Sequence, residues 1–470
     1  MIFASTWFLG YFLPLVLGVY YLLPSAGKWR NRWLLLASYV FYGWWDPLLL
    51  PLLGGLTLWS FGFAWLLGRT DYPDGRRRTL LVLGVSGALL ALFFGKYFGF
   101  ACENYNALAA RWGWSPAPAV NWALPLGISF FTFHAISTLV DVYRREATPM
   151  ASFADYACYL AFFPQLIAGP ILRFGAMAPA FAERRHGWPQ VSAGLGLFCL
   201  GLGKKVLIAN TLAPVADLAF NARQLDAGLA WFGLLAYALQ LYYDFSGYSD
   251  MAVGLGRMFG FEFPRNFNAP YLAESLTDFW RRWHLSLSAF LRDYLYIPLG
   301  GNRHGLGRTC ANLLVVMLLG GLWHGASWTF VVWGLWHGLL LVSERWLDGR
   351  AWYAGFPRFF RVMLTFGLVL IGWVFFRAPT LGAAMDYLRA LVQVVPASEA
   401  PAKLLGVELF TLPHLLTLVA ALFFAWSRRR AHDWSTHLTI RRALLCLVLL
   451  WLSLGVLGTH KANPFLYFQF

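Results

Sequence analysis

The stretch WLLLASYVFYGWWDPLLLPLLGGLTLWSFGFAWLLG, residues 33–68, decides the fold class of this chain. Its one formal charge is Asp46, which stands beside two tryptophans and just before Pro47. A helix rises about 1.5 Å per residue and the apolar core of a bilayer is about 30 Å thick, so the stretch suits two short transmembrane helices with a turn near Asp46. We therefore expect an all-α protein that spans a membrane several times.

The composition of the whole chain of 470 residues agrees with that stretch. Apolar residues make up 59% of it and charged residues 13%, and the mean hydropathy is +0.56. Soluble domains carry about 25% charged residues, so this chain has about half the charged residues that a water-exposed surface usually carries. These values exclude a soluble enzyme, a disordered chain and a disulfide-rich secreted domain. The five scattered cysteines are expected to be small apolar residues, neither in disulfides nor bound to metal.

Basic residues predict the orientation of the chain in the membrane. Clusters occur at residues 28–32 and 69–78, each directly after an apolar segment. Because basic residues gather in cytoplasmic loops, both clusters are expected inside and the N-terminus in the periplasm. The basic residues in 428–442 place that turn inside and the C-terminus in the periplasm in the same way. The net charge of +15 is explained by this bias, and we expect no nucleic acid partner.

The apolar segments predict about eleven spans, all in one domain, residues 1–470. The first segment, residues 1–27, has no basic residues before it, so it is expected to be a retained span and not a signal peptide. Segment 156–174 is broken by proline and glycine, and a broken segment at membrane depth must line a cavity or be packed in protein. The later apolar segments are 79–101, 124–140, 194–220, 228–242, 312–321, 326–342, 361–376, 410–426 and 443–458.

Ten ionisable residues lie in or beside apolar segments, where a charge is costly and often marks a functional site. A structural explanation competes for each one, because basic side chains near helix ends reach toward water and carboxylates pair with nearby arginines. No serine-hydrolase elbow, P-loop or dinucleotide fingerprint competes with them. The ten are His134, Asp141, Lys204, Lys205, Asp244, Asp250, Arg257, His284, His324 and His337.

The segment 278–303 begins with the sequence DFWRRWH and is rich in tryptophan, tyrosine and arginine. This pattern is typical of an amphipathic helix lying in the membrane interface. Asp278 precedes Arg281 and Arg282 by three and four residues, so a local ion pair is the simplest explanation of those charges. Five arginines in and just after the segment are also suited to a phosphate-bearing ligand, which makes Arg281, Arg282 and Arg303 candidate ligand-binding residues.

The string Gly-Leu-Trp-His-Gly occurs twice, around His324 and around His337. If both strings belong to one helix, the two side chains lie about 140° apart around its axis and roughly 20 Å apart along it, so they cannot share a reacting centre. A helical metal site needs histidines about four residues apart, and because no such pair occurs we expect no metal. Smaller and more hydroxylated neighbours favour His324 as the functional residue, and a core histidine bonded to a carbonyl is the alternative for both.

Several strings together resemble the membrane-bound O-acyltransferase family over nearly the whole chain. The resemblance is greatest to bacterial members that act in alginate O-acetylation. His134 departs from the family pattern, in which an acidic residue is expected after Phe133. The strings are Leu124-Pro-Leu-Gly-Ile-Ser-Phe-Phe-Thr-Phe133, Phe163-Pro-Gln-Leu-Ile-Ala-Gly-Pro-Ile-Leu-Arg-Phe174, Tyr243-Asp-Phe-Ser-Gly-Tyr-Ser-Asp-Met251, Asn266-Phe-Asn-Ala-Pro-Tyr271, the segment 278–303, and Leu319-Gly-Gly-Leu-Trp-His-Gly-Ala326.

The resemblance implies a fold and a set of site residues. The fold is a bowl of tilted helices, with re-entrant and interfacial helices, in which a cytoplasmic and an outer cavity meet. The family's catalytic histidine falls on His324 and its other recurrent histidine on His284, while Asp244 and Asn266 lie in matching strings and are candidate substrate-binding residues. A neutral His324 suits a general base or a covalent acetyl carrier, and the sequence leaves both open. His284 is suited to orienting that base or polarising a carbonyl group.

The resemblance also implies a function. The protein is expected in the bacterial inner membrane, taking acetyl from a cytoplasmic donor such as acetyl-CoA or an acyl-carrier thioester, with no bound cofactor. Acetyl is then passed outward for O-acetylation of an exopolysaccharide, most simply alginate, with periplasmic acetyltransferases as partners. The alternatives are D-alanyl or other acyl transfer to a cell-envelope polymer, and a non-catalytic polysaccharide or lipid transporter. Transporters commonly show paired repeats and matched broken helices, and the sequence has neither. A catalytically silent scaffold is disfavoured because both histidine strings are intact.

Overall fold

The computed structural model describes residues 1–24, 28–118, 124–184, 186–222, 224–393, 406–427, 431–436, 438–459 and 466. All regular structure in these residues is helical. By length and composition, six of the described helical segments can cross a membrane, and three shorter apolar helices accompany them. The all-α membrane class is therefore confirmed, whereas the count of about eleven spans stays a prediction. The six segments are Pro47–Leu67, Asp74–Trp112, Trp188–Asn221, Gly305–His324, Arg358–Arg377 and Ile440–Thr459, and the shorter ones are Phe8–Leu22, Ile128–Tyr143 and Leu412–Ala425.

The chain divides into two compact units. One comprises Met1–Gly194 with Ala252–Pro264, and the other comprises Leu195–Met251 with Arg265–Phe470. Helices α10 (Trp188–Gly203) and α12 (Ala227–Met258) each contribute residues to both units. This division concerns packing, and the single domain expected from the sequence stays a prediction.

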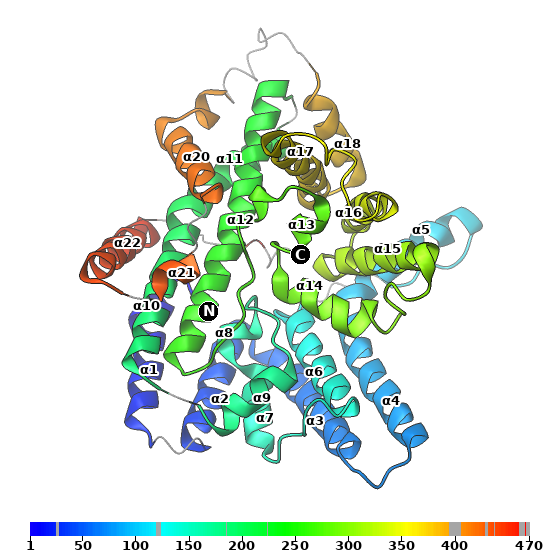
Figure 1. The fold of residues 1–470 in the computed structure, drawn as a ribbon, viewed down its shortest axis with the longest axis vertical. Helices are drawn as coiled ribbons and strands as arrows, with labels where there is room; N and C mark the ends of the chain where they lie inside the picture. Colours follow the sequence, from blue (N-terminus) through cyan, green and yellow to red (C-terminus); the bar gives the residue numbers. More distant parts are fainter. Residues whose placement is uncertain are drawn as a thin grey trace. The chain divides into compact units, whose positions relative to one another are not determined.

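In the first unit, the stretch of residues 33–68 forms two helices as expected. The first ends at Gly43 and the second begins at Leu50, and between them the Asp46 carboxylate accepts a hydrogen bond from the Leu48 N–H at 2.9 Å. Helices α3, α4 and α6 pack on one another (Figure 1). The helices of this unit, besides its parts of α10 and α12, are α1 (Leu13–Leu22), α2 (Lys28–Gly43), α3 (Leu50–Leu67), α4 (Asp74–Leu92), α5 (Phe98–Trp112), α6 (Ile128–Tyr143), α7 (Phe153–Ala161), α8 (Phe163–Leu166) and α9 (Phe174–Ala182).

The broken segment lies between α7 and α9 and is buried, which confirms that it is packed in protein. Three polar side chains along one face of α6 hold its backbone. The ring Nε2 of His134 accepts from the Leu172 N–H at 3.1 Å, and the Ser137 hydroxyl accepts from the Phe174 N–H at 2.8 Å. The Asp141 carboxylate accepts from the Gly175 N–H at 2.9 Å. The side chains of α6 thus satisfy backbone groups that the break leaves without helical partners.

In the second unit, α12 is longer than the sequence predicts. The expected segment ended at residue 242 because Asp244 and Asp250 follow, but the helix continues to Met258. The expected end is wrong because both charges are paired: Asp244 with Lys205 at 2.5 Å and Asp250 with Lys204 at 2.6 Å. The other helices of this unit are α11 (Asn210–Asn221), α13 (Leu276–Trp280), α14 (Leu285–Leu291), α15 (Gly305–His324), α16 (Trp328–Trp346), α17 (Arg358–Arg377), α18 (Leu381–Ala390), α20 (Leu412–Ala425), α21 (Ala431–Ser435) and α22 (Ile440–Thr459).

The condition of a single helix for the two histidine strings is not met, and one further expectation for this unit is wrong. The two Gly-Leu-Trp-His-Gly strings do not share a helix: α15 ends at His324, Gly325 is extended, and the Ser327 hydroxyl accepts from the Thr329 N–H to begin α16. The segment 278–303 is not one amphipathic helix but α13, α14 and a π-helical turn, Arg292–Tyr296. Its interfacial position stays a prediction.

Candidate active site

Helices α15 and α16 form a closely packed hairpin (Figure 1), and a cavity of about 530 Å³ lies against it. Five residues on one face of α15 line the cavity, and the last of them is His324. The rise from the first of them, Leu313, to His324 is about 16 Å in a helix. The five are Leu313, Val316, Met317, Gly320 and His324. The cavity therefore follows α15 down to the histidine, which is only 3% exposed.

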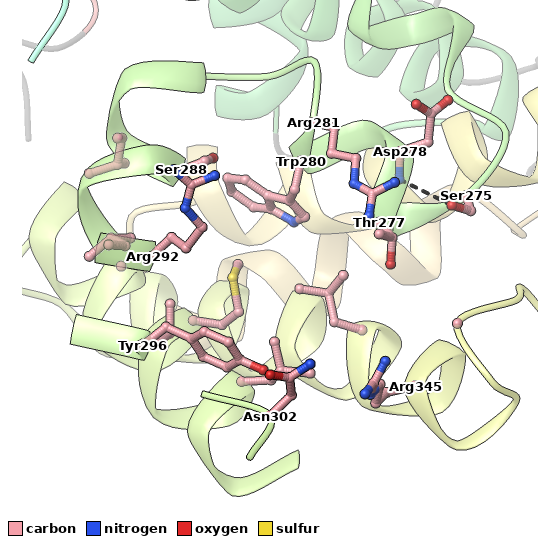
Figure 2. Close-up of a pocket in the computed structure, with 18 of the residues that line it drawn as sticks. Ser275, Thr277, Asp278, Trp280, Arg281, Ser288, Arg292, Tyr296, Asn302 and Arg345 are labelled. Carbon is pink, nitrogen blue, oxygen red and sulfur yellow. Dashed lines mark hydrogen bonds between the residues drawn. The ribbon is translucent and has the colours of Figure 1, made fainter. Parts of the chain in front are cut away.

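The outer part of the cavity is basic, as Figure 2 shows. The exposed residues Arg281 and Arg292 lie on either side of Trp280, and Arg345 faces them across the cavity together with Tyr296 and Asn302. Arg292 is paired with its neighbour Asp293 at 2.6 Å. Among the described residues, no carboxylate forms an ion pair with Arg281 or Arg345, so these guanidinium groups are available to an anionic ligand.

Glu344 of α16 fixes the wall that carries Trp280 and Arg281. Its buried carboxylate accepts from the backbone N–H groups of Leu276 at 2.6 Å and Thr277 at 2.9 Å. These are N–H groups of the first turn of α13, which have no partner within the helix and attract negative charge. The sequence analysis missed Glu344. The feature of the sequence that could have identified it is the position of an acidic residue at the end of an otherwise apolar segment.

Asn266 fixes the turn that carries His284. Its backbone carbonyl accepts from the Leu285 N–H at 2.9 Å, and its side-chain oxygen accepts from the Ser286 hydroxyl at 2.6 Å and the Ser286 N–H at 3.2 Å. His284 has a φ of 44°, in the left-handed region that costs energy for residues other than glycine. Asn266 therefore holds a strained backbone conformation and does not line the cavity.

The His284 ring is fully buried beside the His324 ring. Their centroids are 6.3 Å apart, and the His284 ring also contacts Phe245 at 4.6 Å and Trp323 at 5.7 Å. Neither nitrogen of His284 has a hydrogen-bond partner among the described residues. Burial lowers the pKa of His284 to about 3, so the ring is neutral at physiological pH. A neutral imidazole has one donor and one acceptor to offer.

Trp333 lies between the two histidines of the hairpin. Its ring centroid is 5.1 Å from that of His324 and 5.0 Å from that of His337, so the separation calculated for a single helix does not apply to this hairpin. The His337 ring is fully buried, stacks on Phe279 at 6.1 Å and does not line the cavity. Of the two histidines, the structure brings only His324 to the cavity.

The remaining candidates lie outside the cavity lining. Arg282 pairs with Asp278 at 2.8 Å, which confirms the local ion pair expected from their spacing. Asp244 is paired with Lys205 and also accepts from the Leu466 N–H at 2.8 Å. Arg303 is exposed, and its neighbour Asn302 lines the cavity instead. In the described part of the chain, no three His, Cys, Asp or Glu side chains gather as metal ligands would.

Comparison with known proteins defines the class. Residues 115–378 match the MBOAT, membrane-bound O-acyltransferase family. The chain is 43% identical to the probable alginate O-acetylase AlgI of Pseudomonas putida over the full length of both. It is 46% identical to the probable alginate O-acetylase AlgI of Pseudomonas aeruginosa, over 83% of this chain and 75% of that protein. It is 39% identical to the peptidoglycan O-acetyltransferase of Helicobacter pylori, over 83% and 80% of the two chains.

The chain therefore belongs to the membrane-bound O-acyltransferase family. It is a multi-pass membrane protein and an O-acyltransferase.

Proposed function

We propose that this protein O-acetylates an exopolysaccharide, alginate, and that the acetyl donor is a thioester whose arm enters the cavity along α15. The observation that carries the proposal is the cavity itself, which is basic where Arg281, Arg292 and Arg345 open it and ends at His324. Acetyl-CoA and acyl carriers share a phosphopantetheine arm, and arginines suit its phosphate. The names of the relatives in Pseudomonas support acetyl as the group and alginate as the polymer.

His324 is the general base in this proposal. A neutral imidazole removes the proton of an acceptor hydroxyl as that oxygen attacks the thioester carbonyl, and the carbon–sulfur bond then breaks to release a thiol. His284 is buried beside it and donates its ring N–H toward the developing oxyanion or toward His324. The aromatic rings around both histidines exclude water, which favours the hydroxyl acceptor over hydrolysis.

The relatives and the charge pattern support a proposal for the location of the protein. We place the protein in the bacterial inner membrane with Arg281, Arg292 and Arg345 on the cytoplasmic side, where thioester donors are made. Both termini are then periplasmic, and periplasmic acetyltransferases of the polysaccharide system are the expected partners. The cytoplasmic turn at 428–442 is part of this proposal, and residues 428–430 and 437 of it lie outside the described residues.

The test compares two histidines of the same hairpin. The replacement His324→Ala is expected to lower acetylation by about 10²–10⁴-fold with normal membrane levels, because general-base catalysis is lost. His337→Ala is expected mainly to lower the amount of folded protein, because it leaves a hole among packed rings. The measurements are the acetyl content of the polymer, thiol release from the donor and the amount of protein in membranes. Exchanged phenotypes would overturn the assignment, and polymer movement without thiol release would favour the transporter alternative.

A further inference from the structure

Two adjacent glycines of α15, Gly320 and Gly321, face different surroundings. A Cβ atom added to Gly321 would lie 2.3 Å from the carbonyl oxygen of Phe330 and 3.3 Å from the Cα of Gly334, both on α16. Gly321 therefore allows the two helices of the hairpin to touch. Apart from its chain neighbours and the backbone of its own helix, a Cβ atom added to Gly320 would meet one heavy atom of the described structure within 4 Å, the Cδ1 of Leu291 at 3.4 Å. The packing of the helices therefore does not require a glycine at position 320.

The gap at Gly320 opens into the cavity next to His324. Gly320 precedes His324 by four residues, so the two lie on the same face of α15, one turn apart. Both line the cavity, and so does Leu291, which bounds the gap from α14. Along this face the long side chain of Met317 lines the cavity in the preceding turn of the helix. Gly320 has no side chain and lines the cavity with its backbone. We call the part of the cavity that Gly320 and Leu291 line the acyl notch.

We propose that Gly320 determines the size of the acyl group that this enzyme transfers, because the acyl notch receives the acyl chain while the thioester carbonyl stands at His324. The inference rests on the proposed function, in which a thioester arm follows α15 to that histidine. A side chain at 320 fills the notch from one wall, and a smaller residue at 291 widens it from the other. Glycine at 320 therefore admits a group larger than the notch would accept with alanine there.

The substitution Gly320→Ala separates this role from a structural one. Alanine is favoured over glycine inside helices, and its Cβ atom would make an ordinary contact with the flexible end of Leu291. The folded protein is therefore expected at normal levels or above. Gly321→Ala is the matched control, because its Cβ atom would collide with the backbone of α16.

The experiment uses acetyl and propionyl thioesters of pantetheine, the arm shared by the two classes of donor, with membranes that contain the full-length protein. The wild-type protein is expected to use both donors. In Gly320→Ala, the ratio of kcat/KM for propionyl to that for acetyl is expected to fall about tenfold, the lower end of what one methylene group contributes in a fitted pocket. Leu291→Ala is expected to raise the same ratio, and the double variant is expected to return toward the wild-type value.

Three outcomes would overturn the inference: an unchanged ratio in Gly320→Ala, a wild-type protein that does not use the propionyl donor, or a Gly320→Ala protein lost from membranes as Gly321→Ala is expected to be. His324→Ala, measured with both donors, separates this inference from the proposed function. If His324→Ala abolishes both activities and Gly320→Ala leaves the ratio unchanged, the acyl notch alone is wrong. If His324→Ala changes neither activity, the proposed function fails first.

Discussion

The polar face of α6 and the histidines near α15 show two uses of buried polar residues in one chain. On α6, His134, Ser137 and Asp141 each accept a backbone N–H of the broken segment between α7 and α9. Near α15, the nitrogens of His284 have no partner among the described residues, and His324 lines a cavity. A buried polar group costs stability unless it is hydrogen-bonded. The first group meets that cost with backbone partners, whereas in the second His284 has none among the described residues and His324 lines the cavity.

This comparison explains why two residues of the same type that are equally buried are assigned different roles, one structural and one catalytic. His134 and His284 are both fully buried histidines in strings that resemble one family. Their types and hydropathy do not distinguish them, but their hydrogen bonds do. Buried groups that bind the backbone, as the Nε2 of His134 does, are expected to change stability when replaced, and groups beside the proposed reacting centre are expected to change rate.

The largest effect is expected at a fully partnered charge. Lys205→Met leaves the Asp244 carboxylate buried without its cation, and breaking such a pair costs about 3–5 kcal/mol. Thermal unfolding in detergent measures this loss. The double variant Lys205→Met with Asp244→Leu is expected to recover most of the stability and to keep acetylation. A double variant that folds but does not acetylate would show that Asp244 binds substrate, as the sequence alone suggested.

The two buried histidines give the next largest effect. His284→Asn keeps a residue that tolerates a positive φ but removes the ring, and a loss of about 10²-fold in kcat is expected if the ring assists the oxyanion. His134→Ala removes the acceptor of the Leu172 N–H and is expected to lower stability by about 1–3 kcal/mol while kcat per folded molecule stays unchanged. Initial rates normalised to folded protein distinguish the two. If His284→Asn changes only stability, His284 belongs with the polar face of α6.

Glu344 tests whether a fully partnered residue acts on the cavity through the wall it holds. Glu344→Gln keeps one acceptor oxygen for α13 and loses the charge, with an expected cost of about 1–2 kcal/mol. Because Arg281 directly follows α13, KM for the donor is expected to rise several-fold more than kcat falls. Asp386→Asn, in an exposed pair with Arg389, is the matched control and is expected to change neither. A fall in kcat with KM unchanged would contradict the positioning role.

The smallest effect is expected at the opening of the cavity. Arg345→Gln removes a cavity-lining cation, so KM for a phosphate-bearing donor is expected to rise about three- to tenfold at low salt and less at high salt. Arg303→Gln is the comparison, because Arg303 is exposed but outside the lining. Steady-state kinetics at two ionic strengths measure both. Equal increases for the two variants would mean that the donor extends beyond the cavity to Arg303.

Local patterns predicted several features of this protein correctly. The single charge in residues 33–68 marked the turn at Asp46, and the prolines and glycines in 156–174 marked the broken segment. The spacing of Asp278 and Arg282 predicted their ion pair. Each of these depends on residues near one another in the sequence. The end of α12 was misjudged because the partners of its aspartates, Lys204 and Lys205, come from about 40 residues away.

The amino-acid sequence by itself determined that this is an all-α membrane protein of the O-acyltransferase family, with His324 and His284 as its candidate catalytic residues. The apolar composition shows that the chain belongs in a membrane. Long sequence motifs identify the family without any knowledge of which residues are in contact. Only the tertiary structure decided that the hairpin breaks after His324, that Glu344 and Asn266 bind the segments around Trp280 and His284, and that Gly320 and Gly321 have different surroundings. These features depend on contacts between residues that are far apart in the sequence. The pattern of residues within one segment does not show which distant segment lies within a few ångströms of it.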